Sequence, residues 1–485
     1  MQQPNILLIT TDQQRADCLG VARSAHPVMT PHLDQLAWEG VRFTRAYSDC
    51  PLCIPSRTTI MTGRPAYQHG VDTNGEFRIP EQPQDTLPGR LGAAGYQTHA
   101  AGKMHFHPPR NRNGFERMRL LPEDYVNWLE QAGYGGMYRG HGMGGNEVHP
   151  VFSAVPEAYT ATSWTVEESI GFLRQRDTEA PFFMWTSFEA PHPPFDPLES
   201  YVRLYDSIAM ADPVAGEWNG ESAPQWVRHR RLSRKLDLLS EQVVRAARKH
   251  YYAMITHIDY ALGRLLGELK SQRLWEDTII VFASDHGEML GDHGLFHKSC
   301  FYEPSAKVPL IVKPARSTPL PLPAGSVCDS PVLLADLYPT LTQLTGCARS
   351  GDDAREGRSL LEAMEPGGER RVLYGYIQDE GGLYMATDGS WKYLYYAQDG
   401  REQLFRLVDD PDERQDLSGA DDEQSRAVLA EYRVRIADQF AAHGLTDGEG
   451  ALQLGMADES GSDERRHRTA NPFAWRGPIH HGGHW

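Results

Sequence analysis

Three short apolar runs, at residues 6–9, 182–186 and 278–282, each lead into a polar cluster. Continuous apolar runs of this length are typical of strands that are buried on both faces of a parallel sheet. Helical periodicity occupies the sequence between them, for example at residues 31–38 and 241–269. Strands that alternate with helices predict an α/β fold, with a doubly wound, mostly parallel sheet flanked by helices.

The polar residues that follow these runs predict a binding site. Asp12, His192 and Asp285 each stand shortly after one of the three predicted strands. In open α/β sheets, ligands bind outside the carboxyl ends of the strands. We therefore expect these three side chains to converge on one rim of the sheet, although they are far apart in the sequence.

A second structural unit is predicted after residue 365. The stretch GGLYMATDGSWKYLYYAQDGREQLFRL indicates three short strands joined by Asp-Gly turns, which are typical of antiparallel hairpins. A helix is expected from about residue 421 to 440. We divide the chain into a catalytic α/β domain at 1–365, a smaller unit of antiparallel sheet plus helix at 366–456, and a tail at 457–485.

The tail is first charged and then rich in Trp, Pro and His, without periodicity. Each large aromatic ring left in water forgoes roughly 1.5 to 3 kcal/mol of burial. We therefore predict that the tail packs on its own domain or on a neighbouring subunit. A homo-oligomer is consistent with the second arrangement.

Composition and charge limit the class of partner. The chain has 485 residues, of which 48 are basic and 65 acidic, so its net charge is −17. This excess of acidic groups argues against nucleic acid or an anionic membrane surface as the general partner. No apolar stretch reaches about 18 residues, and the N-terminal apolar run lacks the basic region and cleavage site of a signal peptide. Six cysteines without paired zinc spacing favour a reducing compartment, so we predict a cytoplasmic protein.

One cysteine stands in a setting that favours chemistry. In CIPSRTTIMTGR, Cys53 is predicted at the N-terminus of a helix, beside Arg57 and Arg64. A helix dipole and two guanidinium groups would lower the pKa of a thiol or hold a sulfate or phosphate. Two alternatives need no such chemistry: a buried cysteine beside a structural arginine, or a redox pair with Cys50.

The CxPSR run, followed by TGR, resembles the signature of the type I sulfatases, a family of the alkaline-phosphatase-like superfamily. The resemblance extends over most of the chain, because further motifs stand in the family's order and spacing. These motifs are the Asp-bearing first strand, GKMH, PHPPFDP, SDHGEMLGDHGLFHK and DGSWKYL.

The resemblance implies a modified nucleophile. In the family this cysteine, here Cys53, is oxidised to formylglycine by a formylglycine-generating enzyme. The hydrate of that aldehyde offers one hydroxyl that takes the sulfate and a second whose deprotonation expels it, which a serine could not reproduce.

The resemblance also implies roles for the residues around this nucleophile. Arg57 and Lys103 would orient the formylglycine, and His105 would deprotonate its remaining hydroxyl. His192 and Lys298 would hold the sulfate and protonate the leaving oxygen. Substrate contacts are thus expected from Asn74, Lys103, His192 and Lys298.

A single divalent metal is implied at Asp12, Gln13, Asp285 and His286. Two carboxylates, an amide oxygen and an imidazole suit Ca²⁺ best, with Mg²⁺ or Mn²⁺ as alternatives. The family often has an acidic residue in place of Gln13 and an asparagine in place of His286, so metal identity is less firmly implied.

The predicted function is hydrolysis of a carbohydrate, aryl or small organic sulfate monoester. The alternatives are a phosphonate monoester or phosphodiester hydrolase of the same fold, an inactive binding protein of this fold, and an unrelated thiol or metal enzyme. We expect sulfate to be preferred, because relatives that act on phosphonates tend to carry hydroxyl residues in place of GKMH. The Gly-rich loop 134–147 is a candidate for the rim of the substrate pocket, and the alternative is a solvated polar loop. The same two alternatives apply to the histidines that flank the site in the sequence: His107, His141, His149, His293 and His297.

Overall fold

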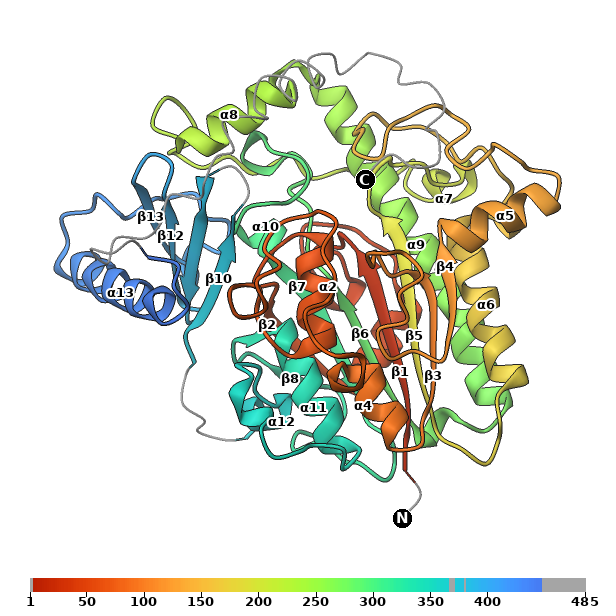
Figure 1. Cartoon of the computed structure of the whole chain (residues 1–485). Coiled ribbons are helices and arrows are strands. Elements are labelled where there is room, and N and C mark those ends of the chain that lie inside the picture. Colours follow the sequence, from red (N-terminus) through yellow and green to blue (C-terminus); the bar gives the residue numbers. More distant parts are fainter. Residues whose placement is uncertain (1–2, 366–370, 379–380, 447–485) are drawn as a thin grey trace.

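The computed structural model describes residues 3–365, 371–378 and 381–446. Its main sheet has nine strands in the order β4-β3-β5-β1-β6-β7-β2-β8, with β9 paired to β2 (Figure 1). The strands are β1 Asn5–Asp12, β2 Val41–Tyr47, β3 Gln97–Lys103, β4 Arg117–Leu121, β5 Phe182–Pro191, β6 Thr278–Ser284, β7 Lys307–Lys313, β8 Ser326–Cys328 and β9 Val332–Leu333.

The predicted mostly parallel α/β fold is confirmed. β1 lies between β5 and β6 and runs parallel to both, whereas β7 is antiparallel to β6 and to β2. The three predicted strands are β1, β5 and β6. Both faces of β1 are buried, since Ile6 and Leu8 belong to one hydrophobic cluster and Leu7 and Ile9 to another. This two-sided burial explains why the run is continuously apolar.

Helices cover the two faces of the main sheet. α1, α6 and α9 pack with Leu7 and Ile9, and α2, α4 and α11 pack with Ile6 and Leu8. The predicted helices at 31–38 and 241–269 are α1 and α9. Along the described chain the helices of this unit are α1 Pro31–Glu39, α2 Cys53–Thr62, α3 Ala66–His69, α4 Leu87–Ala93, α5 Glu123–Gln131, α6 Ala161–Gln175, α7 Glu199–Arg203, α8 Gln225–Ser233, α9 Glu241–Ser271, α10 Glu303–Ala306, α11 Leu337–Leu344 and α12 Leu360–Ala363.

A second, antiparallel sheet has the strand order β10-β11-β12-β13 and packs against α13 Glu423–Ala442. Its strands are β10 Leu373–Ile377, β11 Leu383–Thr387, β12 Trp391–Tyr396 and β13 Arg401–Arg406. The last three strands and the helix agree with the prediction, whereas β10 was not predicted. At Gly375 in β10, a Cβ atom would come within 2.8 Å of the Asp49 carbonyl oxygen, so glycine lets this strand approach the main unit closely.

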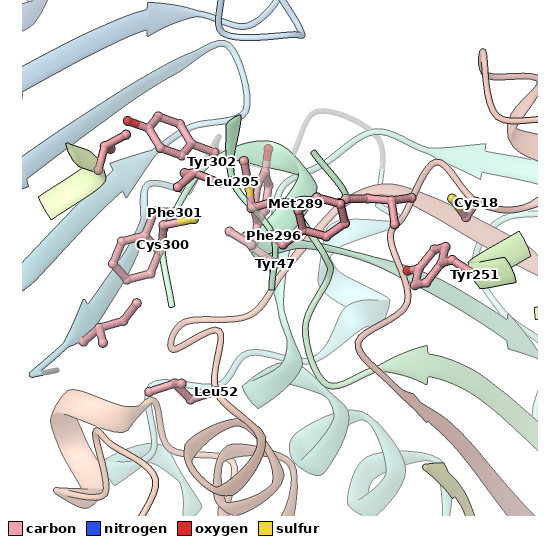
Figure 2. Packing of buried hydrophobic residues seen from close by; sticks show 14 of the residues in the cluster. Cys18, Tyr47, Leu52, Tyr251, Met289, Leu295, Phe296, Cys300, Phe301 and Tyr302 are labelled. Carbon is pink, nitrogen blue, oxygen red and sulfur yellow. The ribbon is translucent and has the colours of Figure 1, made fainter. Parts of the chain in front are cut away.

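A shared hydrophobic cluster joins the two sheets. Tyr47 of β2, and Phe301 and Tyr302 before α10, belong to the same cluster as Leu394 and Phe405 of the second sheet. Figure 2 shows Tyr47, Phe301 and Tyr302 in this cluster, and Figure 1 shows the second sheet beside the β2 side of the main sheet.

The domain boundaries at residues 365 and 456 stay predictions, and the tail 457–485 lies outside the described residues. Within the described ranges, no helix combines the length and the apolar character that crossing a bilayer requires. All six cysteines lie in those ranges, and each is buried and outside any disulfide.

Candidate active site

The candidate site lies at the carboxyl ends of β1, β5 and β6. In the strand register Asp12 is opposite Pro191, and Thr11 is opposite Ser284. The residues that follow, His192 and Asp285, are therefore carried to the same rim as Asp12. The predicted convergence of these three side chains agrees with the structure, and parallel pairing is its cause.

Cys53 is the first residue of α2 and is buried. Its Sγ atom lies 3.3 Å from Nε2 of His286 and 3.7 Å from Oδ1 of Asp12. Interactions with His105 and His192 also reach the thiol. Residues from four separate parts of the chain thus surround one sulfur atom.

The electrostatics around Cys53 favour an anion. Burial raises the pKa of the thiol, but Lys298, Lys103 and His286 outweigh burial and hold the pKa well below its usual range. The N-terminus of α2 adds to the positive potential.

The expected contribution of Arg64 is wrong. Gly63 ends α2, and Arg64 lies beyond it, where its Nε atom is 2.7 Å from Glu81 and its Nη1 atom donates to the Ala354 carbonyl. The helix separates it from Cys53, since each helical residue adds about 1.5 Å of rise.

Arg57 ties the helix of Cys53 to the strand ends. Its guanidinium is buried, with Nε 2.9 Å from Oδ2 of Asp285 and Nη1 2.8 Å from Oγ of Ser187. Nη1 also donates to the Lys103 carbonyl. A planar group with several donors can satisfy three strand ends at once, so Arg57 sets the position of α2 relative to β3, β5 and β6.

Four side chains form a cluster that could hold a metal ion. One ligand atom from each of Asp12, Cys53, Asp285 and His286 lies within 4.8 Å of the others. Nε2 of His286 is 3.6 Å from Asp12 and 3.7 Å from Oδ1 of Asp285. Burial and the neighbouring Asp12 raise the pKa of Asp285, which indicates that two carboxylates held this close repel each other. A divalent cation would relieve that repulsion, so the donor set fits a metal.

Gln13 points its amide toward two charged groups. Its Oε1 atom accepts a 2.5 Å hydrogen bond from Nζ of Lys298, and its Nε2 atom donates to Glu288. Glu288 also accepts backbone N–H bonds from Leu290 and His297, so it fixes the loop that carries Lys298. The predicted ligand oxygen of Gln13 is therefore shared with a lysine in this structure.

Two lysines also lie close to Cys53. Nζ of Lys103 is 2.5 Å from Oδ2 of Asp12, and Nζ of Lys298 is 2.8 Å from Nε2 of His192. Burial, Lys298 and Lys103 lower the pKa of His192 to about 4, so the imidazole is neutral at pH 7. Asn74 lies beside the same helix terminus, where its Oδ1 atom accepts from the backbone N–H of Ile54.

The residues of this site lie in a part of the chain that matches a known protein family. The Sulfatase family pattern matches residues 4–347. The chain is 33% identical to an arylsulfatase of Clostridium perfringens over 479 residues, which cover 93% of this chain and 98% of the relative. A choline-sulfatase of Rhizobium meliloti is 32% identical over 91% of this chain and 87% of its own.

The chain belongs to the sulfatase family. It is accordingly a sulfuric ester hydrolase of the alkaline-phosphatase-like superfamily. Among solved structures, the phosphonate monoester hydrolase of Agrobacterium radiobacter has a TM-score of 0.74 and 27% identity, over 91% of this sulfatase and 96% of its own chain.

The structure places the residues predicted for the nucleophile, the metal and the sulfate contacts around Cys53 or one contact away from it, whereas Arg64 lies elsewhere. It also adds Ser187 and Glu288, which sequence reasoning missed. Both act on partners at least 130 positions away, Ser187 on Arg57 and Glu288 on Gln13, so no local spacing could have indicated them. The only signal for Glu288 is that an acidic residue follows Asp285 closely in SDHGE.

Proposed function

We propose that this protein hydrolyses a sulfate monoester at Cys53, after a formylglycine-generating enzyme has converted Cys53 to formylglycine. The observation that carries the proposal is the position of Cys53. Its side chain lies within the carboxylate-imidazole cluster, with Lys103 and Lys298 close by. A sulfate ester has several oxygens to grip, and a site with several cationic groups stabilises charge as it moves to the leaving oxygen.

A divalent cation is part of the proposal. Asp12, Asp285 and His286 would hold it, with Gln13 supplying an amide oxygen. Ca²⁺ is favoured, because most of these ligand atoms are oxygens, and Mg²⁺ or Mn²⁺ are the alternatives. When bound, the cation supplies positive charge next to the sulfate oxygens.

The other residues orient groups and move protons. Formylglycine, as its hydrate, supplies a nucleophilic hydroxyl and a second hydroxyl on the same carbon. Lys103 and Arg57 lie against Asp12 and Asp285 and keep the nucleophile in position. Among the described residues no hydrogen-bond partner faces Nδ1 of His105, which suits a group that takes up a proton.

His192 and Lys298 act on the leaving side. The 2.8 Å contact between Nε2 of His192 and Nζ of Lys298 places a proton donor and an acceptor at one point of the site. We assign the sulfate contact and the protonation of the leaving oxygen to this pair. Asn74 contributes a further contact to a sulfate oxygen through its amide group.

A comparison of esters tests the proposal. For the mature enzyme we expect kcat/KM for 4-nitrophenyl sulfate to exceed the values for 4-nitrophenyl phosphate and a phenylphosphonate monoester by at least about tenfold. That ratio corresponds to about 1.4 kcal/mol of transition-state stabilisation. Lys103 and His105 carry the expectation, since a base beside the nucleophile suits release of sulfate from the hydrate.

A second candidate function is hydrolysis of phosphonate monoesters or phosphodiesters. The similarity to the phosphonate monoester hydrolase of Agrobacterium radiobacter favours it. Equal or reversed preference among the three esters would select this second candidate. The absence of turnover on every ester, with Cys53 fully converted, would instead indicate a binding protein.

A reducing compartment such as the cytoplasm completes the proposal. It is supported by the six buried cysteines, all of them outside any disulfide. A homo-oligomer stays a prediction.

A further inference from the structure

A cavity opens beside His192. Its walls come from the end of β5, the N-terminal end of α6, the middle of α9 and residues 137–139 of the Gly-rich loop. His192 is part of this wall and also contacts Lys298. The cavity therefore begins at the point where the leaving group of a sulfate held by His192 and Lys298 would lie.

The first polar feature of the wall is a half-buried ion pair. Nη2 of Arg139 is 2.9 Å from Oε1 of Glu189, and the Tyr138 hydroxyl is 3.0 Å from both carboxylate oxygens. Burial alone would raise the pKa of Glu189. Arg139, Lys103 and His192 together lower this pKa by more than burial raises it, so the carboxylate is ionised. The charges of Arg139 and Glu189 cancel within the wall.

The second polar feature is Asp196, which also lines the cavity. Its Oδ2 atom lies 3.1 Å from Nε2 of His141. Nδ1 of His141 accepts the backbone N–H of Met143, so the ring hydrogen stands on Nε2 and is donated to Asp196. Asp196, too, is an acceptor already paired with a donor.

The rest of the wall is mostly apolar or aromatic, and Ser153, Thr160, Thr162 and His257 add polar groups. Tyr125, Met254 and the prolines that flank His192 contribute to it. A wall of this kind can cover the C–H face of a ring, while its few polar groups fix the orientation of a ligand.

These features match one class of leaving group. A hydroxyl both donates and accepts, so neighbouring hydroxyls on a ring fit a wall in which donors and acceptors stand side by side. A quaternary ammonium group binds on the face of an aromatic ring or beside a carboxylate without a cation, and a second anionic group would require an unpaired cation. In this wall the guanidinium of Arg139 already lies 5.2 Å from the centroid of the Tyr138 ring. Both carboxylates of the wall have donors beside them, and Arg139 already neutralises Glu189.

We propose that the cavity beside His192 receives the leaving group, and that this group is a neutral, polyhydroxylated one, such as a saccharide. Arg139, Glu189 and Asp196 contact its hydroxyls. The inference rests on the proposed function, since it takes sulfate cleavage at Cys53 as given. It also makes the Gly-rich loop 134–147 a substrate-binding loop.

The loop is held in place for this role. His297, next to Lys298, has its Nε2 atom 2.9 Å from the Asn146 carbonyl oxygen at the end of the loop. Glu189 and Asp196 hold its middle through Tyr138, Arg139 and His141. The loop thus spans the two groups that grip the sulfate, His192 and Lys298, and cannot be displaced without losing contacts at both ends.

The test uses the full-length, matured enzyme. Substrates are a panel of galactose and glucose monosulfates, choline sulfate and 4-nitrophenyl sulfate. The variants are Arg139→Lys, Tyr138→Phe and Asp196→Asn, and the control is Arg174→Met, which removes an exposed Arg-Glu pair with Glu268. Melting temperatures identify any variant that fails to fold, and Tyr138→Phe removes only one oxygen atom.

The measured quantity is kcat/KM for the best saccharide sulfate divided by kcat/KM for the aryl sulfate. We expect each of the three cavity variants to lower this ratio, and Arg139→Lys to lower it by about tenfold. Arg174→Met should leave the ratio unchanged. An unchanged ratio in all three cavity variants, faster turnover of choline sulfate than of every saccharide sulfate, or turnover of the aryl sulfate alone would overturn the inference.

A binding measurement separates this inference from the proposed function. Saturation-transfer NMR with the free saccharides should detect binding to the wild-type enzyme and a weaker signal with Arg139→Lys. If no sulfate ester is hydrolysed but this difference persists, the proposed function fails, whereas the cavity remains a saccharide-binding site. If aryl sulfate is hydrolysed but no saccharide binds, the cavity assignment fails alone.

Discussion

Cys53 and Cys300 are both buried, but their surroundings shift the pKa of the two thiols in opposite directions. Burial raises the pKa of Cys300 to about 12. At Cys53 burial acts in the same sense, yet Lys298, Lys103 and His286 reverse the shift. The charges placed around Cys53 by distant strands and loops, rather than burial, therefore distinguish it as a reactive position.

Replacing Cys53 by serine should abolish turnover of 4-nitrophenyl sulfate, because a serine hydroxyl cannot supply a geminal diol. The melting temperature should change little, since serine is close to cysteine in size. Cys50→Ser is the matched control, three positions away, and should keep the activity. Peptide mass spectrometry of the wild-type enzyme should find Cys53 without thiol reactivity and reactive toward a hydrazine probe. Full activity with an unmodified thiol would refute the assignment.

Metal removal should destabilise the protein as well as inactivate it. Asp12 and Asp285 are fully buried and close together, and a cation bound only by the folded state stabilises that state. At a ligand concentration of about 100 Kd the stabilisation is about 2.7 kcal/mol. Chelation should therefore lower the Tm, and added Ca²⁺ should restore it.

Asp285→Asn is the matched variant for this measurement. It removes one negative charge from the cluster, so its Tm should respond less to the chelator than that of the wild-type enzyme. Unchanged activity in a preparation shown to be free of metal would contradict the assignment.

At the scale of elements, α9 holds the start of α1 through one carboxylate. Oδ1 of Asp259 accepts the backbone N–H of Leu33 at 2.8 Å, and Oδ2 accepts that of His32 at 3.1 Å. Burial raises the pKa of Asp259 to about 7, against an ordinary value of 3.8, in spite of these two bonds. The Asp259 carboxyl group therefore binds its proton more tightly in the folded state than in the unfolded one.

This shift predicts a pH dependence of stability. An acid whose pKa is raised by folding makes the folded state less stable as pH rises from about 4 to about 7, by up to about 4 kcal/mol. Asp259→Asn imitates the protonated carboxyl group and should lack this loss. Urea unfolding at several pH values gives the free energy of unfolding of the variant and of the wild-type enzyme. As pH rises, the variant should become more stable relative to the wild-type enzyme. A pH-independent difference would show that Asp259 does not titrate in this range.

The sequence predicts elements whose burial is two-sided or strongly periodic, and it misses the others. β1, β5 and β6 are continuous apolar runs, and α1 and α9 are periodic. β3, with the sequence QTHAAGK, is buried but built from small and polar residues, and β10 contains Gly375. No local pattern marks either as a strand, because their burial depends on neighbours that are distant in the sequence.

The same limit applies to the site. Motifs locate Cys53, Asp285 and Lys298, because their chemistry and local spacing are characteristic. Ser187 and Glu189 have no motif of their own, and their roles arise from contacts with Arg57 and Arg139 across the folded chain. The prediction for Arg64 is wrong for the converse reason. Arg64 belongs to the same motif as Cys53, but it lies beyond the other end of α2 and pairs with Glu81.

For the whole molecule, a buried charged cluster connects the second sheet to the catalytic unit. Nζ of Lys392 in β12 lies 2.6 Å from Glu303 and 2.9 Å from Glu413, and it donates to the Phe301 carbonyl oxygen. All three side chains are buried. Glu303 begins α10, shortly after Lys298, so this cluster connects the second sheet to the loop that carries Lys298.

Lys392→Met should destabilise the protein by about 3 to 5 kcal/mol, because it leaves the buried Glu413 carboxylate without its cation and leaves Glu303 with Lys307 alone. Arg433→Met removes an exposed partner of Glu402 in the same unit and should cost about 1 kcal/mol or less. Denaturant unfolding of both variants measures the difference. Equal, small effects would mean that water reaches the cluster and that it does not hold the sheets together.

The pairing of β1 with β5 and β6 also has an evolutionary consequence. Asp12, His192 and Asp285 are placed relative to one another by strand register, and the segments between them leave and return to the same sheet. Insertions in those segments, such as loop 134–147, can therefore lengthen or shorten without moving the reaction centre. One residue inserted into β1 would instead reverse the faces of its side chains. We expect diverging lineages to acquire new substrates by changes in loop length, while the strand ends keep their spacing.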